Sequence, residues 1–174
     1  GINDNSYSNN WSLPTTVFNA LLDAVTNYIT VKVVDGDGNA TILIDAFYVK
    51  KDTTPPVFNN AEAGGDNQAR QQAGTTYDVD VLDAGSGIAR FEYSASTKAT
   101  TGLADLIPWT TIAVLSGATS YATDWSVEFD SLLEGTTNYV SIRAWDVAGD
   151  TRTITDAFYI LKDTQGPSVA ITNP

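Results

Sequence analysis

The sequence predicts an all-β protein made of two-sheet sandwiches in tandem. Three observations predict it: short stretches alternate apolar and polar residues, glycine, asparagine and aspartate separate these stretches, and one long stretch occurs twice. Residues 18–56 and 129–167 align without a gap at an offset of 111 residues, and 16 of the 39 positions are identical. A period of this length is the size of an independent domain rather than of a solenoid unit.

The repeat sets the expected domain boundaries. Residues 57–167 form one complete repeat, 1–56 form the C-terminal half of the preceding repeat, and 168–174 form the start of a following one. The linker DTTPP at 52–56 ends the first copy, because proline has no N–H to donate to a sheet. We expect the chain to be a segment of a longer array of repeats.

Alternation places the strands of the duplicated half. In residues 29–33 and their copy 140–144, every second residue is apolar or small, which is typical of a half-buried strand. The turns at 35–39 and 146–150 contain the glycine, asparagine and aspartate that hairpins need, so strands at 42–49 and 154–160 follow.

The rest of the chain supplies the first half of the fold. Residues 18–25 have helical spacing, but their copy contains Gly135 and Thr136, so we expect a strand end and a crossing turn there. Strands are also expected at Trp11 and Trp125. The complete repeat then has about seven strands and no helix longer than a turn, with its first-half strands at 57–58, 75–82, 88–94 and 109–115.

Composition excludes several classes of function. The chain has 9 basic and 21 acidic residues and a formal net charge of −12, which would repel nucleic acid and anionic membrane surfaces. No apolar run is long enough to insert into a membrane. Cysteine and histidine are absent, which excludes disulfides, thiolate and imidazole metal sites and the commonest general base.

The complete repeat resembles a known family. Its second half matches the pattern of the bacterial Ig-like and fibronectin type III-like repeats of prokaryotic surface proteins, 83–88 looks like that family's first turn, and DTTPP is similar to its linkers. The resemblance implies tandem Ig-like β-sandwiches, one complete and one C-terminal half, in an extracellular or cell-surface spacer, adhesive or filament. It implies no catalytic residues. The matching residues are Trp125, Phe129, Leu132, Gly135, Tyr139, Arg143, Ala144, Asp146, Ala148 and Gly149.

Two acidic patterns raise the question of calcium. Asp35, Asp37 and Asn39 copy the first ligands of a calcium loop, but Ala46 stands where the bidentate glutamate belongs. Turn capping is the favoured interpretation and calcium the alternative. A cation could also bind Asp52 or Asp163 at a junction between repeats, near Asp83, although a solvated polar linker is again favoured.

Other candidate sites lie on the surface. Trp145 is out of phase with the buried residues of its strand, so it is the candidate ligand contact of a glycan-binding module. Asn10 and Asn39 fit the glycosylation sequon, a pattern short enough to arise by chance.

We therefore expect a non-catalytic structural repeat of an extracellular filament, stalk or surface layer, with no cofactor. An adhesin, a carbohydrate-binding module or an accessory domain of a secreted enzyme is the alternative. Residues 1–56 carry a hydrophobic stripe without a first half to cover it. The expected partners are neighbouring repeats, whose strands, upstream in the chain or on another subunit, complete this half. In the second case, 168–174 would be the reciprocal end donated to the next molecule.

Overall fold

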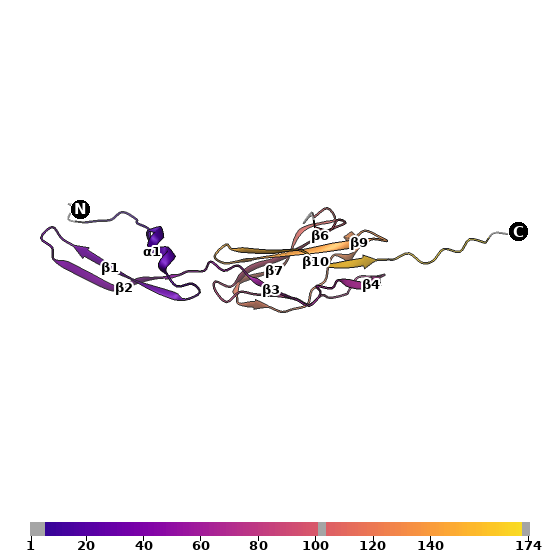
Figure 1. The fold of residues 1–174 in the computed structure, drawn as a ribbon, viewed down its shortest axis with the longest axis horizontal. Coiled ribbons are helices and arrows are strands. Elements are labelled where there is room, and N and C mark those ends of the chain that lie inside the picture. Colours follow the sequence, from indigo (N-terminus) through magenta and orange to yellow (C-terminus); the bar gives the residue numbers. More distant parts are fainter. Residues whose placement is uncertain (1–5, 101–103, 172–174) are drawn as a thin grey trace. The chain divides into compact units, whose positions relative to one another are not determined.

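The computed structural model describes residues 6–100 and 104–171, and in this part the chain is all-β apart from two short helices. It divides into two compact units, Gly1–Thr53 (unit 1) and Thr54–Pro174 (unit 2) (Figure 1). No helix among the described residues has the length and apolar character needed to cross a membrane.

Unit 1 is one hairpin with a short helix. The strands β1 (Thr26–Val34) and β2 (Ala40–Lys50) pair antiparallel, and the helix α1 (Thr15–Ala20) precedes them. The strand end expected at the start of residues 18–25 was wrong, because residues 18–20 belong to this helix. The carbonyl of Pro14, at the N-cap, accepts the first helical hydrogen bonds from the N–H groups of Val17 and Phe18, each at 2.9 Å. Trp11, expected in a strand, lies in irregular structure.

Unit 2 contains two sheets. The five-stranded sheet has the order β4-β10-β9-β6-β7, with β10 parallel to β4 and the other pairs antiparallel, and the three-stranded sheet has the order β3-β5-β8. A 3₁₀ turn, η1 (Phe129–Ser131), precedes β9. The strands are β3 (Val57–Asn60), β4 (Asp66–Arg70), β5 (Val79–Leu82), β6 (Ile88–Ser96), β7 (Ile107–Ala118), β8 (Ser120–Tyr121), β9 (Thr137–Asp146) and β10 (Thr151–Lys162).

One hydrophobic core joins the two sheets of unit 2. Val79 and Val81 of the small sheet and Phe91, Ile142 and Phe158 of the large sheet are all buried in it. In β5 the buried residues Val79 and Val81 alternate with the less buried Asp80 and Leu82. In β9 and β10, Ser141 and Ala157, the neighbours of Ile142 and Phe158, are buried as well. The arrangement is compatible with a β-sandwich.

Two strands of unit 2 were not predicted. The residues of β4 are almost all polar, so no alternation marks them, and this strand joins the sheet edge by pairing with β10. β8 has only two residues. Trp125 forms an isolated bridge with Tyr77 rather than part of a strand, and the regular part of the stretch expected at 75–82 begins only at Val79.

The two copies of the duplicated stretch are held by the same hydrogen bonds. The side-chain amide of Asn27 accepts from the N–H of Leu22 at 2.9 Å, and that of Asn138 accepts from the N–H of Leu133 at 2.8 Å. Each amide nitrogen also donates to three backbone carbonyls in matching positions. The duplication therefore preserves the local geometry as well as the sequence.

Candidate functional site

The hairpin turn at Asp35 is closed by its own hydrogen bonds. Oδ1 of Asp35 accepts from the N–H groups of Asp37 and Asn39 at 3.0 and 2.8 Å, and Oδ2 accepts from the side-chain amide of Asn39 at 2.9 Å. These bonds, that of the Asn39 side chain foremost, lower the pKa of Asp35. Asp37 enters the network through its backbone, so the geometry is that of a capped turn.

Trp145 projects from the five-stranded sheet between two arginines. The guanidinium carbon of Arg90 lies 4.0 Å from the centre of the indole ring and that of Arg143 lies 4.4 Å from it. Arg143 also lies over Trp109 at 4.2 Å, and both arginines pair with Glu92. The ring is half-buried in this network, which leaves less of its surface for stacking on a sugar.

The two sequon asparagines differ in their surroundings. Asn10 is exposed in irregular structure, whereas the side-chain nitrogen of Asn39 donates to Asp35 within the turn. Glycosylation of either residue stays a prediction.

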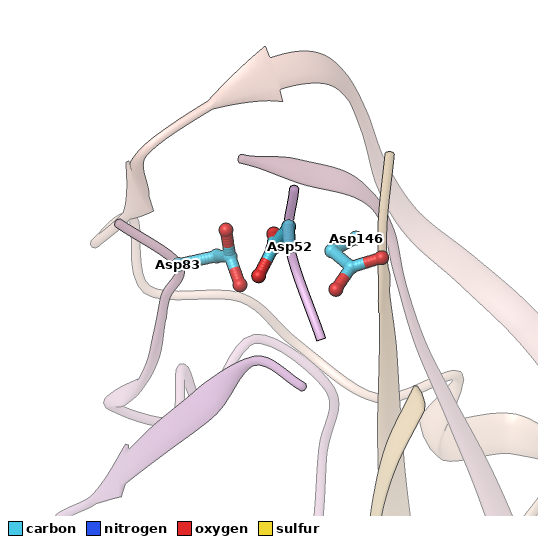
Figure 2. Close-up of side chains that lie close together, drawn as sticks. All are labelled: Asp52, Asp83 and Asp146. Carbon is cyan, nitrogen blue, oxygen red and sulfur yellow. The ribbon is translucent and has the colours of Figure 1, made fainter. Parts of the chain in front are cut away.

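Two buried aspartates meet where β5 and β9 end. Asp83 follows β5 and Asp146 is the last residue of β9; their side chains are buried, and a carboxylate oxygen of one lies within 4.8 Å of one from the other. Figure 2 draws this pair together with Asp52, a linker residue of unit 1. Within unit 2, the β3–β5 register puts Val57 opposite Leu82, so the residue before β3 enters the unit beside Asp83.

Backbone hydrogen bonds fix both carboxylates. Oδ1 of Asp83 accepts from the N–H groups of Gly85 and Gly87 at 3.1 and 2.7 Å, and Oδ1 of Asp146 accepts from those of Gly149 and Asp150 at 2.6 and 2.8 Å. The N–H of Val147 donates to the carbonyl of Gly87, so the two turns are also joined to each other.

Glycine is required at position 87 of the first turn. Its φ is +82°, and a Cβ there would lie 2.2 Å from the carbonyl oxygen of Gly117. The close approach of these two backbones holds the Asp83 turn against the end of β7. Sequence analysis placed a turn at 83–88 and placed Asp146 in a hairpin, without linking the two.

The other expected junction residue lies elsewhere. The N–H of Asp163 donates to the carbonyl of Arg70, beside β4. This is the opposite end of β10 from the hairpin that contains Asp146.

A second buried carboxylate network lies at the sheet edge. Asp66 accepts from Arg70 Nε at 2.7 Å, from the Tyr77 hydroxyl at 3.3 Å and from the N–H of Gln68 at 3.2 Å. Burial alone would raise the pKa of Asp66, but these hydrogen bonds and the charge of Arg70 outweigh it and lower the pKa below its ordinary value. Burial and the neighbouring Asp66 raise the pKa of Tyr77, so its hydroxyl keeps its proton.

Comparison with protein-family models and with curated proteins finds no match for this chain.

Proposed function

We propose that this chain is a non-catalytic structural repeat of an extracellular filament, stalk or surface layer, in which neighbouring repeats complete one another. The observation that supports the proposal is that the duplicated stretch presents the same apolar surface in both units. It is exposed in unit 1, and in unit 2 its counterpart is covered by the first half of the repeat.

The exposed surface of unit 1, which we call the open face, surrounds a hollow of about 810 Å³ between the stretch before β1 and the hairpin. Trp11 is 53% exposed and Phe47 39%, although their rings are in edge contact at 5.8 Å. None of the described residues of unit 1 is buried. The apolar residues that line the hollow are Trp11, Leu13, Phe18, Val31, Leu43, Phe47 and Val49.

In unit 2 the corresponding apolar surface is covered, and the residues that cover it indicate what would cover the open face. Trp125 and Phe158, 5.9 Å apart, correspond to Trp11 and Phe47, but they are only 6% and 2% exposed. Tyr77 stacks on Phe158 at 4.7 Å, and Phe91 meets Trp125 edge-on at 5.7 Å. Tyr77 and Phe91 belong to the first half of the repeat, so the missing cover of unit 1 has the chemistry of residues 57–121.

A single donated strand would not replace this cover. By the offset of 111 residues, 168–171 correspond to β3, and β3 pairs with β5 rather than with β9 or β10. The exchange of 168–174 alone, one of the expectations from sequence, is therefore not part of the proposal. A whole first half, from a neighbouring repeat, is what the open face requires.

The proposal that a first half of the repeat covers the open face can be tested by adding a first half to the chain. A copy of residues 57–121 joined ahead of residue 6 supplies a first half, and we expect the amides of β1 and β2 to gain hydrogen-exchange protection toward that of β9 and β10. The same insert with its counterpart of Phe91 changed to aspartate is the matched control. Equal protection of β1–β2 with both inserts would contradict the proposed mode of completion.

Assembly requires a separate measurement on the chain extended after Pro174 by a copy of residues 64–121, which gives it a free first half at its C-terminal end. We expect electron microscopy at increasing protein concentration to show regular polymers without added ligand. Phe47→Asp should abolish these polymers, whereas Tyr48→Asp, on the other face of β2, should leave them intact. An extended monomer that binds a glycan would instead support the adhesin alternative.

A further inference from the structure

Two of the buried carboxylates in unit 2 lack a basic partner. Of the four that are buried among the described residues, Asp66 pairs with Arg70, and Glu92 pairs with Arg90 and Arg143. Asp83 and Asp146 are 5% and 2% exposed, and no ion pair joins either of them to a lysine or arginine of the described chain.

Asp146 has an oxygen with nothing to bind. Its Oδ1 accepts two backbone hydrogen bonds, but its Oδ2 is buried and has no hydrogen-bond partner. A buried carboxylate oxygen without a partner is unfavourable, and a second carboxylate within 4.8 Å adds repulsion between like charges. Figure 2 labels Asp83 and Asp146, whose carboxyl groups come close to each other from two different turns.

A cation bound between the two carboxylates would give the unpartnered oxygen of Asp146 a ligand and would offset the repulsion between the two negative charges. The backbone bonds to Oδ1 of each residue hold the carboxylates in place before any ligand arrives, so binding would require little rearrangement. All side-chain ligands on offer are oxygens, which favours a hard cation, and the flexible geometry of calcium suits two carboxylates supplemented by carbonyls and water.

We propose that Asp83 and Asp146 of unit 2 hold a calcium ion. The site ties the turn after β5 to the hairpin between β9 and β10, and therefore links the two sheets at the end where the chain enters the unit. It differs from the calcium loop considered at Asp35, whose carboxylate is exposed and occupied by its own turn. The inference depends on unit 2 alone, so it can fail while the proposed function stands.

Calcium titration of the chelator-treated full chain tests the site directly. We expect one calcium ion to bind, with heat detectable by calorimetry, and the melting temperature of unit 2 to rise on calcium addition. Asp146→Asn and Asp83→Asn should each weaken binding about tenfold or more and remove the rise in melting temperature. Because Asp146→Asn removes one buried charge, this variant without calcium should melt no lower than the parent without calcium.

Asp78→Asn is the matched control for general attraction to an acidic surface. Asp78 is exposed and precedes β5, so its loss changes the net charge equally but should leave calcium binding unchanged. The proposal is overturned if the parent chain binds no calcium and its melting is unaffected. It is also overturned if Asp78→Asn reduces binding as much as Asp146→Asn does.

Discussion

Unit 1 and the β9–β10 part of unit 2 contain two copies of one repeated stretch, identical at 16 of 39 positions, in two different environments. The asparagine cap recurs, and so does the lysine that donates to carbonyls of the preceding turn: Lys51 to Leu21 at 3.0 Å and Lys162 to Leu132 at 2.9 Å. Yet the core positions of the second copy are buried and those of the first are not. The comparison teaches that the repeat's second half encodes its own hairpin but not its own core.

Truncation of the duplicated phenylalanine should show the largest difference. Phe158→Ala removes a ring packed between Tyr77 and Trp125 and should lower the free energy of unfolding of unit 2 by about 3 to 5 kcal/mol. Phe47→Ala at the open face should cost less than about 1 kcal/mol in a monomeric chain. Urea denaturation, followed for each unit by hydrogen exchange, measures both.

An equal effect of the two truncations would break the comparison. It would mean that the open face is already covered in the monomer. A Phe158→Ala effect below about 1 kcal/mol would instead contradict the inward phase of β10.

The asparagine caps should show the next largest difference. Asn138 is fully buried and makes four hydrogen bonds to backbone, so Asn138→Ala leaves buried groups unpaired and should cost about 1 to 3 kcal/mol. Asn27 makes the same bonds closer to water, where the groups that lose a partner can be hydrated. Asn27→Ala should therefore have a smaller effect, measured as the change in exchange rate of the Leu22 amide against that of Leu133.

Sequence reasoning found the strands of both copies but not this cap. Alternation predicted β1 and β9, and the turn residues at 35–39 and 146–150 predicted that β2 and β10 follow them. The role of Asn138 depends on three carbonyls of which one, that of Ile160, lies on another strand. The only signal in the sequence was that Asn27 and Asn138 are identical at the repeat offset, which shows repetition without a reason for it.

The closeness of Asp83 and Asp146 could not be predicted from the sequence either, because it also depends on contacts between distant parts of the chain. The two residues are far apart in the chain and meet through the approach of Gly87 to Gly117 and the bond from Val147 to Gly87. Neither contact produces a periodic pattern in the amino-acid sequence. The short α1 helix was missed because the prediction followed the copy, in which Gly135 and Thr136 stand where a helix would continue.

Acid should destabilise unit 2 partly through Asp66, a residue without a counterpart in unit 1. Because its pKa is lowered in the folded state, its contribution to stability is present above its unfolded pKa of about 3.9 and is lost as the pH falls through the folded value. Asp66→Asn should flatten the pH dependence of the unfolding free energy below about pH 4.

The exposed Asp130 provides the control for this pH dependence. Asp130→Asn removes the same charge from the surface and should leave the acid limb of the stability profile nearly unchanged. If Asp66→Asn and Asp130→Asn gave the same profile, the network of Asp66 with Arg70 and Tyr77 would not be the source of the acid sensitivity.

The smallest expected effect comes from one backbone position in the two copies. Gly135 and Ala24 both have positive φ, +66° and +57°, and the N–H of each donates to a lysine carbonyl of the last strand, at 2.9 and 2.8 Å. A residue with a Cβ is strained in this conformation, and glycine is not. Gly135→Ala should therefore destabilise unit 2 by about 1 kcal/mol, and Ala24→Gly should stabilise the turn of unit 1 by a similar amount, slowing exchange of its amide about fivefold.

Nothing lies within 4 Å of the Cβ that alanine would add at 135, so steric crowding does not enter the comparison. Stability changes of opposite sign in the two units would show that both turns share one backbone geometry despite their different burial. A loss of hydrogen-exchange protection in Ala24→Gly would mean that the turn of unit 1 does not hold the left-handed conformation in solution.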